Sequence, residues 1–475
     1  MKTPKYSMRP LRTKMHNGDT IAAVSTPPGK GGVALIRCSG AEAFEIARRC
    51  FTSKSGKDIE EFPLRHAIYG HICNGAGEAI DDGILTLFPA SSSYTGENVA
   101  EISCHGGVLV TRAVLQAVLE AGARPAAAGE FTRRAFLSGR LSLYEAEAIG
   151  DLLEAVNDNQ MRLSSVSSRK RLREAVKAIT DEMTHLVSSL YALIDFPDED
   201  LSEMSEEEIL ASLQHILESL SRLASTYRTG RAISEGIETV ICGRPNVGKS
   251  SLYNALCGEE LAIVTSIAGT TRDLLSETVS AGRVTLRLTD TAGIRHTDQE
   301  IDEVEKIGIR RAEQALEQAE LVLAVFDSSE PLTQEDLALI HNLKEKEKTV
   351  IAILNKADLP YGIDRTEIDA LTPHVLSLSV QDDLSALHAL IEELCIDRAL
   401  STGADAILFD ARHFAAVTRA TDYVRASYEA FCARLPADLA FQDVELAIGA
   451  LEELDGRGVT NALVDHIFSR FCVGK

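Results

Sequence analysis

Basic residues are scarce relative to acidic ones in this 475-residue sequence: 48 Lys and Arg stand against 71 Asp and Glu, and the formal net charge is −23. The chain as a whole therefore does not attract nucleic acid, and any RNA contact must use a local basic patch. None of the nine cysteines forms a CxxC pair, which disfavours zinc sites and disulfide frameworks and fits a reducing compartment. No apolar run approaches the ~18 residues of a membrane span, so we expect a soluble protein.

The N-terminal segment also has little that identifies it. The first fifteen residues, MKTPKYSMRPLRTKM, carry five basic side chains, no acidic one and no clear apolar face. They fit either a transit peptide or a solvated extension before the fold, and we favour the extension because Met15 can itself be a start. A cytoplasmic protein is therefore expected.

The apolar pattern changes along the chain. Residues 18 to about 135 mix short apolar runs with Gly and Pro turns, which is typical of a compact α+β domain. From about 140 to 235 the period is helical, and one seam contains Leu172, Val176, Ile179, Met183, Leu186, Leu190 and Leu193. Ser205 and Glu208 then offer a capping box before a second seam of Ile209, Leu213, Ile216 and Leu220.

A different pattern interrupts the helical one. Residues 238 to about 398 alternate β-rich runs with helical stretches, which indicates a parallel sheet, and from about 405 the helical period returns. A single core usually stops growing near ~250–300 residues, so several domains are expected. We predict a multidomain α/β + α fold with an extension at 1–17, an α+β domain at 18–135, an all-α domain split between 136–235 and 399–475, and an inserted Ras-like P-loop domain at 236–398.

A phosphate-binding signature, Gly243-Arg-Pro-Asn-Val-Gly-Lys-Ser250, stands between an apolar strand and a helical stretch. Its glycines let backbone N–H groups surround phosphates, Lys249 brings a positive charge to the β- and γ-phosphates, and Ser250 can ligate Mg²⁺. Asp290-Thr-Ala-Gly293 follows and supplies a carboxylate and a glycine that can sense the γ-phosphate. The order of these motifs predicts a nucleotide switch.

The base specificity comes from Asn355-Lys-Ala-Asp358. The Asp358 carboxylate can accept hydrogen bonds from guanine N1–H and the exocyclic amine, which selects GTP over ATP. Backbone at Ser379 and Val380 is placed to meet guanine O6. The residues predicted to bind GTP are Asn246, Val247, Gly248, Lys249, Ser250, Ser251, Thr265, Ser266, Ile267, Ala268, Gly269, Thr270, Thr271, Asp290, Thr291, Ala292, Gly293, Asn355, Lys356, Ala357, Asp358, Ser379 and Val380.

Two positions affect the predicted hydrolysis mechanism. Ile294 stands where Ras-like enzymes have a water-orienting Gln, so another group must orient the attacking water. Asn246 lies inside the phosphate loop, and the small-residue segment 265–273 has carbonyls that can turn toward a monovalent cation. Asn246 is either a ligand of such a cation or a simple turn residue, and the chemistry alone favours neither.

Further motifs connect the chain to a known family: Thr26-Pro-Pro-Gly-Lys-Gly-Gly-Val33, Tyr94-Thr-Gly-Glu97, His105-Gly-Gly107, Gly129-Glu-Phe-Thr-Arg-Arg-Ala-Phe136, Asp195-Phe-Pro-Asp-Glu199 and Cys472-Val-Gly-Lys475. With the GTPase motifs, they resemble the MnmE (also called TrmE) family of tRNA-modification GTPases from about residue 18 to the end. The resemblance implies a homodimer whose N-terminal α+β domain binds a reduced folate, 5-formyl- or methylene-tetrahydrofolate. It also implies a GTPase domain that dimerises across K⁺.

The resemblance also implies partners and residue roles. With the flavoprotein MnmG, in a heterotetramer or larger complex, such a protein adds an aminomethyl-type (carboxymethylaminomethyl) group at C5 of wobble uridine 34 in certain tRNAs. The implied ligands of K⁺ are Asn246 and backbone at Thr265, Ile267 and Thr270, and those of Mg²⁺ are Ser250 and Thr271. The implied folate ligands are Arg37, Glu101, Arg140 and Lys475, and the implied catalytic residues are Glu305, which orients water, Lys249 and Cys472.

The chemistry of the folate suits these side chains. A buried carboxylate such as Glu101 can accept hydrogen bonds from the two adjacent N–H donors of the pterin edge. The basic side chains can instead donate to the formyl, carbonyl or glutamate oxygens of the folate. The C-terminal Gly474 and Lys475 do not fit a prenylation box. The tail is then either frayed or a working part that places Cys472 as a nucleophile near the folate.

Two alternatives to this function stay open. A ribosome-assembly GTPase would bind RNA without modifying it, and it should carry a second GTPase domain or a basic KH-type module with a GxxG loop. The N-terminal domain, in turn, can be a dimerisation scaffold that binds no folate.

Overall fold

The computed structural model describes residues 18–195, 204–258, 276–289, 314–380, 383–397, 400, 405–458, 461–469 and 471–474. The chain divides into two compact units: the first unit contains residues 1–150 and 455–475, and the second unit contains residues 151–454. No helix in the described ranges is both long and apolar enough to cross a membrane.

A seven-stranded sheet with the order β3-β4-β5-β6-β2-β1-β7 forms the first unit. Neighbouring strands are antiparallel except β1 and β7, which are parallel. The strands are β1 (Ile21–Val24), β2 (Val33–Ser39), β3 (Phe51–Ser53), β4 (Ile68–Cys73), β5 (Ala79–Phe88), β6 (Val99–His105) and β7 (Arg124–Pro125).

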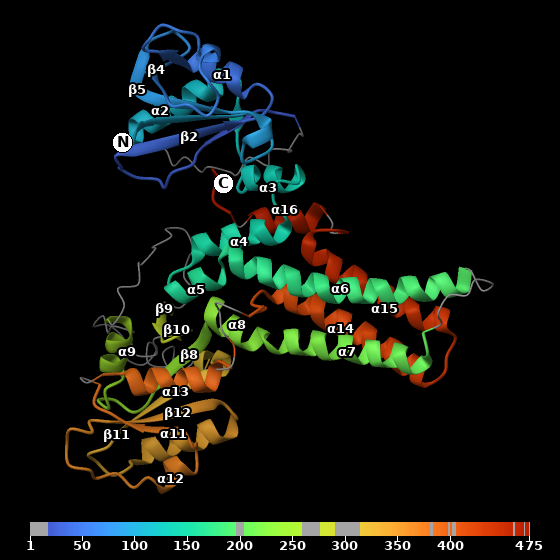
Figure 1. The fold of residues 1–475 in the computed structure, drawn as a ribbon. Helices are drawn as coiled ribbons and strands as arrows, with labels where there is room; N and C mark the ends of the chain where they lie inside the picture. The colour runs from blue at the N-terminus through green and yellow to red at the C-terminus, as the bar shows by residue number, and fades with distance from the viewer. Residues whose placement is uncertain are drawn as a thin grey trace, which may run out of the picture. The chain divides into compact units, whose positions relative to one another are not determined.

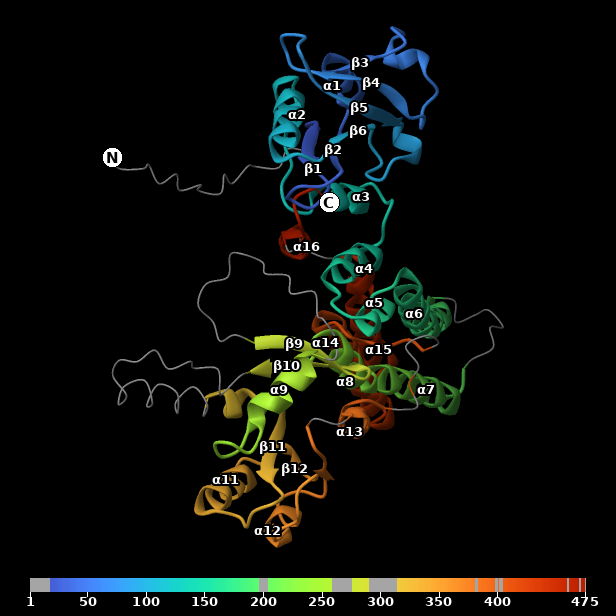
Figure 2. The ribbon, with the colours of Figure 1, turned by 90° about the vertical axis from the view of Figure 1, so that its left-hand side faces the viewer.

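One face of this sheet carries the core of the first unit. Side chains alternate along β2, so Ala34, Ile36 and Cys38 point into the core. Helices α1 (Ala43–Cys50) and α2 (Val108–Glu120) pack on this side of the sheet, as Figure 2 shows. Arg37 alternates with these residues and therefore lies on the opposite face. The α+β class predicted for this region is confirmed.

Short helices complete the first unit. They are α3 (Glu130–Leu137), the start of α4 (Leu143–Glu154) and α16 (Asn461–Ser469), with 3₁₀ turns η1 (Ile59–Glu61) and η2 (Ala90–Ser92). Phe468 of α16 lies between two other rings, with centroid distances of 6.1 Å to Phe136 and 5.5 Å to Phe471. This aromatic cluster fixes the C-terminal helix within the first unit.

Four long helices form a bundle in the second unit: α6 (Val166–Asp195), α7 (Glu206–Ser225), α14 (Ala411–Cys432) and α15 (Ala437–Glu452). Both α6 and α14 pack against α7 and α15, and the four run side by side in Figure 1. Shorter elements are α5 (Asp158–Leu163), α8 (Tyr227–Ser234) and the 3₁₀ turn η3 (Glu453–Asp455).

The predicted apolar seams are confirmed by burial. The seam residues of α6 that are buried are Leu172, Val176, Ile179, Met183 and Leu186, and those of α7 are Ile209, Leu213, Ile216 and Leu220. The structure does not describe the side chains of Leu190 and Leu193. The predicted capping box is also confirmed, because Ser205 accepts from Glu208 N and the Glu208 carboxylate accepts from Ser205 N.

A six-stranded sheet with the order β13-β12-β11-β8-β10-β9 is inserted between α8 and α14. The strands are β8 (Ile237–Cys242), β9 (Ser276–Ala281), β10 (Val284–Thr289), β11 (Leu321–Asp327), β12 (Thr349–Asn355) and β13 (Val375–Ser377). All neighbours are parallel except the edge strand β9, which is antiparallel to β10. The inserted α/β fold predicted from the alternating pattern is confirmed.

Helices cover both faces of this sheet. Side chains of α9 (Lys249–Gly258) and α13 (Ser385–Cys395) join the core on one face, and side chains of α11 (Gln334–Glu345) and α12 (Thr366–Asp369) join the core on the other. Ligands of such sheets bind beyond the carboxyl ends of the strands. The segments that follow β8, β11, β12 and β13 share that edge.

Candidate functional site

The glycine-rich loop connects β8 to α9, in the strand–loop–helix context that the sequence predicts. Gly243 and Gly248 have φ values of +148° and +105°, which favour glycine. A Cβ at Gly248 would lie 2.1 Å from Asn355 Nδ2, so a side chain cannot be added there without movement. Lys249 Nζ donates to the carbonyl oxygens of Gly243 and Arg244, both at 2.9 Å. The loop thus wraps around the Lys249 ammonium.

Asn246 adopts a left-handed backbone conformation with φ of +65°. Asparagine tolerates this region better than most residues, so the conformation agrees with a turn role. The suggested K⁺ partners Thr265, Ile267 and Thr270 lie outside the described residues. The role of Asn246 as a cation ligand therefore stays a prediction.

Asn355 connects the end of β12 to the phosphate loop. Its Nδ2 donates to Val247 O at 2.7 Å, and its Oδ1 accepts from Val380 N at 3.1 Å. The side chain is buried, as is Ser379. The structure therefore brings together predicted residues from three separate loops. Four other predicted GTP-binding residues are exposed, namely Ser250, Ser251, Ala357 and Asp358.

Sequence analysis does not identify Asp327, which lies at the end of β11. Its Oδ2 accepts from Lys356 Nζ at 2.5 Å, and Lys356 has a left-handed φ of +61°. Burial alone would raise the pKa of Asp327, but hydrogen bonds from Lys356 and Ser329 hold that pKa below its ordinary value. An acidic residue at the carboxyl end of a buried apolar strand is the signal that points to it.

Some predicted residues lie outside the described ranges, and their roles stay predictions. These are Thr265, Ser266, Ile267, Ala268, Gly269, Thr270, Thr271, Asp290, Thr291, Ala292, Gly293, Glu305 and Lys475.

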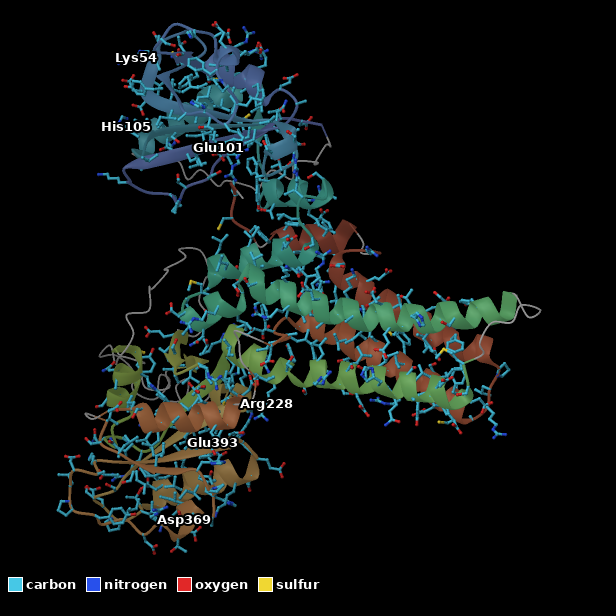
Figure 3. All side chains as sticks on the ribbon, in the orientation of Figure 1. Lys54, Glu101, His105, Arg228, Asp369 and Glu393 are labelled. Atoms are coloured by element: carbon cyan, nitrogen blue, oxygen red, sulfur yellow. The ribbon has the colours of Figure 1, made fainter. Side chains whose placement is uncertain are left out.

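Two of the predicted folate ligands face each other in the first unit. Arg37 on β2 is paired with Glu101 on β6, and Arg37 Nε donates to Glu101 Oε1 at 2.8 Å. The Arg37 guanidinium also lies over the rings of Tyr94 and Phe131, at 5.5 and 5.8 Å from their centroids. Figure 3 shows Glu101 on this sheet.

The expectation that the Glu101 carboxylate is buried is wrong. Its side chain is 22% exposed and lies on the sheet face opposite α1 and α2. Its partner Arg37 is similarly placed, so a ligand can reach both. Arg140, which follows α3, is exposed and donates to Ala90 O at 2.6 Å.

The C-terminal tail is anchored in the first unit. Val473 forms an antiparallel bridge with Ala128, and Ser25 Oγ donates to Gly474 O at 2.8 Å. Gly474 is buried with φ of +104°, and a Cβ there would lie 2.1 Å from Val24 O. The frayed-tail alternative is therefore wrong for residues 471–474. Cys472, held between these contacts, is exposed.

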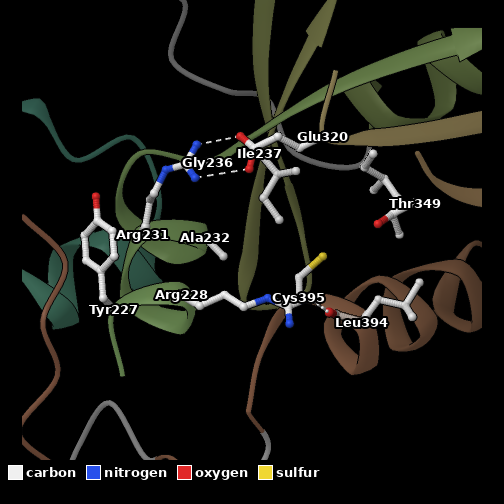
Figure 4. A pocket seen from close by; sticks show the side chains of 11 residues that line it. Tyr227, Arg228, Arg231, Ala232, Gly236, Ile237, Glu320, Thr349, Leu394 and Cys395 are labelled. Atoms are coloured by element: carbon white, nitrogen blue, oxygen red, sulfur yellow. Dashed lines mark hydrogen bonds and ion pairs between the residues drawn. The ribbon is translucent and has the colours of Figure 1, made fainter. Parts of the chain in front are cut away.

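A cavity of about 240 Å³ lies at the opposite edge of the six-stranded sheet (Figure 4). It is lined by residues at the starts of β8, β11 and β12, by α8 and by the end of α13. Arg231 donates two hydrogen bonds to Glu320 there, at 2.5 and 3.1 Å. Because the nucleotide motifs follow the carboxyl ends of the strands, this cavity is not the candidate GTP site.

Known proteins match nearly the whole chain. The family model of the GTP-binding protein TrmE N-terminus matches residues 20–140, and that of the MnmE helical domain matches residues 143–472. The tRNA modification GTPase MnmE of Thermoanaerobacter sp. is 40% identical over 462 residues, which cover 96% of this chain and 99% of that protein. The protein of the same name from Geobacillus kaustophilus is 39% identical over 463 residues, with 96% and 99% coverage.

Among solved structures, Era from Aquifex aeolicus is similar to this chain, with 23% sequence identity. The match covers 39% of this chain and 65% of the Era chain. The TM-score of this match is 0.24. The chain belongs to the MnmE family of tRNA modification GTPases.

Proposed function

We propose that this GTP hydrolase of tRNA modification uses K⁺-dependent GTP turnover to drive modification of wobble uridine 34. In this proposal a homodimer works in the cytoplasm with the flavoprotein MnmG, and a carboxymethylaminomethyl-type group is added at C5 from a reduced-folate carbon. The observation that carries the GTPase part is the Asn355 side chain, which joins the phosphate loop to the guanine-side loop. Family membership favours this function over the ribosome-assembly alternative.

The residues of the phosphate loop have distinct roles in this proposal. Backbone N–H groups around Gly248 donate to the phosphates, and the Lys249 ammonium neutralises charge on the β- and γ-phosphates. Asn355 keeps the loop in place through Val247 O. The carboxylate of Asp358 then selects guanine, because it accepts hydrogen bonds from N1–H and the exocyclic amine of that base.

The phosphate loop contains residues that can bind metal ions. Ser250 is exposed in the first turn of α9, where phosphate loops have their Mg²⁺ ligand. Asn246 is exposed, and its side-chain oxygen is the proposed ligand of K⁺ together with Thr265, Ile267 and Thr270. Thr271 is the second proposed ligand of Mg²⁺. K⁺ supplies positive charge beside the β–γ bridge. Glu305 is proposed to orient the attacking water in place of the absent Gln.

The Arg37–Glu101 pair supports a folate site on the sheet face opposite α1 and α2. Glu101 Oε1 accepts from Arg37, which leaves Oε2 for a donor on the pterin edge. The reduced folate supplies the one-carbon unit. We place Arg140 and Lys475 at its oxygens, and Cys472 at the carbon, on the strength of the tail contacts with Ala128 and Ser25.

GTP turnover in KCl and in NaCl tests the cation proposal. We expect faster turnover in KCl, and we expect Asn246→Ala to remove the difference. Asn254→Ala is the matched control, because Asn254 is an exposed asparagine on the adjacent α9. Equal turnover in the two salts would overturn K⁺ dependence.

Nucleoside mass spectrometry of tRNA tests the modification. A strain that lacks this protein is complemented with the intact chain, with Cys472→Ser, or with the exposed-cysteine control Cys432→Ser. We expect the modified uridine with the intact chain and the control, and none with Cys472→Ser. Absence of the nucleoside with the intact chain would overturn the proposal, whereas its presence in all three would remove only the role of Cys472.

A further inference from the structure

Basic side chains are concentrated near the start of α6. Residues 162–177 hold six basic side chains and one acidic side chain, in a protein whose net charge is −23. The candidate GTP and folate sites use none of these residues. The run is the local basic patch that an acidic protein needs if it is to contact RNA.

Three of these side chains form what we call the basic stripe: Lys170, Arg173 and Lys177. Their spacings of three and four residues place them on one face of α6. All three are exposed, whereas Leu172 and Val176 on another face of the helix are buried in the bundle. At a rise of 1.5 Å per residue, the stripe spans roughly 10 Å along the helix axis.

The first turn of α6 lacks the acidic side chains that commonly stabilise the start of a helix. The start of a helix prefers acidic side chains because its backbone N–H groups are unpaired. Helix α7 follows this rule with Glu206, Glu207 and Glu208 in its first turn. Helix α6 has no acidic residue in its first turn, and basic residues follow directly. The start of α6 is therefore positively charged, because no acidic side chain in its first turn offsets the unpaired N–H groups.

The buried and exposed members of the run differ in role. Arg169 is buried, pairs with Asp151 and lies 4.0 Å from the centroid of the Phe409 ring, so it stabilises the fold. Lys170 is 72% exposed, and its ion pair with Glu174 is 3.7 Å long. An exposed pair of this kind contributes little to stability, which leaves the Lys170 charge available to a ligand.

We infer that the basic stripe of α6 binds the phosphate backbone of tRNA, an inference that rests on the proposed function in tRNA modification. Lysine and arginine on a solvent-facing helix neutralise phosphates and release counterions. Protein interfaces instead have apolar or aromatic centres that are depleted in lysine. The stripe has two lysines and one arginine, so its chemistry fits an RNA backbone.

The test measures binding of the full chain to a fluorescein-labelled, unmodified tRNA transcript with a wobble uridine. Fluorescence anisotropy is followed at increasing KCl for the intact chain and for Lys170→Gln/Arg173→Gln/Lys177→Gln. The matched control is Arg222→Gln/Arg425→Gln/Arg434→Gln, which removes three exposed basic residues elsewhere on the bundle. Lys170→Arg/Lys177→Arg retains the charge.

We expect the stripe variant to bind about tenfold or more weakly, and its salt slope to fall by about 2, since each phosphate contact contributes roughly 0.7–0.9. The control and the charge-retaining variant should bind like the intact chain. GTP turnover without tRNA should be unchanged in the stripe variant, which shows that it is folded.

Other outcomes separate the two claims. Unchanged affinity and slope in the stripe variant would overturn this inference and leave the tRNA function intact. Failure of the intact chain to bind tRNA would overturn both. If the variant binds tRNA normally but no longer co-purifies with the flavoprotein, the stripe is a protein surface and the inference is wrong.

Discussion

Gly248 shows how one missing side chain shapes the candidate nucleotide site. An added Cβ would lie 2.1 Å from Asn355 Nδ2, and the φ of +105° strains any other residue by ~1–3 kcal/mol. Relief of this clash displaces either the loop or the amide that holds Val247 and Val380. We therefore expect Gly248→Ala to weaken GDP binding by about tenfold or more.

Titration with a fluorescent GDP analogue measures this effect. Gly258→Ala, at the end of α9, is the control, because a Cβ at Gly258 meets nothing within 4 Å. Unchanged affinity in Gly248→Ala would show that the close approach to Asn355 does not constrain the loop.

A buried carboxylate makes the first unit sensitive to acid. Glu130 accepts hydrogen bonds from Arg124, Arg134 and Ala127 N. Burial alone would raise its pKa, but Arg124 and the other partners hold the pKa below its ordinary value of 4.5. Since the folded pKa is the lower one, this stabilisation is complete above the unfolded pKa and is lost as the pH falls through the folded pKa.

Glu130→Gln is expected to destabilise the first unit by about 3 kcal/mol at neutral pH, because Arg124 and Arg134 both lose their ion pair with this buried carboxylate. The variant should then lose less stability than the intact chain as the pH falls from about 7 to about 3. Chemical denaturation across this range measures both effects. Glu60→Gln, which changes an exposed carboxylate, should behave like the intact chain. Equal acid sensitivity in all three proteins would remove Glu130 as the cause.

The C-terminal tail is an element whose position depends on one glycine. Gly474→Ala would place a Cβ 2.1 Å from Val24 O at a φ of +104°, so we expect the tail to leave its site and lose the Ser25 hydrogen bond. A faster release of C-terminal residues by carboxypeptidase would report this. Val473→Ala trims an exposed side chain and retains the backbone bridge to Ala128, so it should be digested like the intact chain. The same rate in Gly474→Ala would contradict the anchored tail.

Elements with local signals could be predicted from the sequence. The seam of α7 repeats at helical spacing, and the Ser205–Glu208 capping box lies within one turn. The phosphate loop is likewise a contiguous motif. These features follow from the order of neighbouring residues, so no knowledge of the tertiary fold is needed.

Pairings between elements could not be predicted in the same way. Arg37 and Glu101 are 64 positions apart and meet only because β2 and β6 pair in one register. Asp327 and Lys356 are 29 positions apart and meet across two parallel strands. The exposure of Glu101 depends on which sheet face α1 and α2 cover. Strand register and helix packing decide such features, and both involve residues distant in sequence.

At the scale of the whole molecule, the inserted sheet is connected to the bundle through two adjoining chain segments. Gly230 on α8 approaches the outgoing chain so closely that a Cβ would lie 1.9 Å from Leu408 O. Leu408 N donates to Thr226 Oγ1 at 3.0 Å, and Tyr227 stacks on Phe414 at 4.2 Å. If GTP turnover drives the proposed rearrangement, we therefore expect α8 and α14 to move together.

The two compact units give the last prediction. Because each has its own core, we expect two thermal transitions. GDP should raise only the transition of the second unit, and 5-formyltetrahydrofolate only that of the first. A ligand at 100 times its dissociation constant stabilises its unit by about 2.7 kcal/mol, which shifts a midpoint by several degrees.

Scanning calorimetry with each ligand measures these shifts. Gly248→Ala should reduce the GDP shift alone, and Glu101→Ala the folate shift alone, so the two variants act as controls for each other. A single transition that responds to both ligands would contradict independent units. Two transitions with no folate shift in the intact chain would instead favour the scaffold role of the N-terminal domain, because binding to the folded state must stabilise that state.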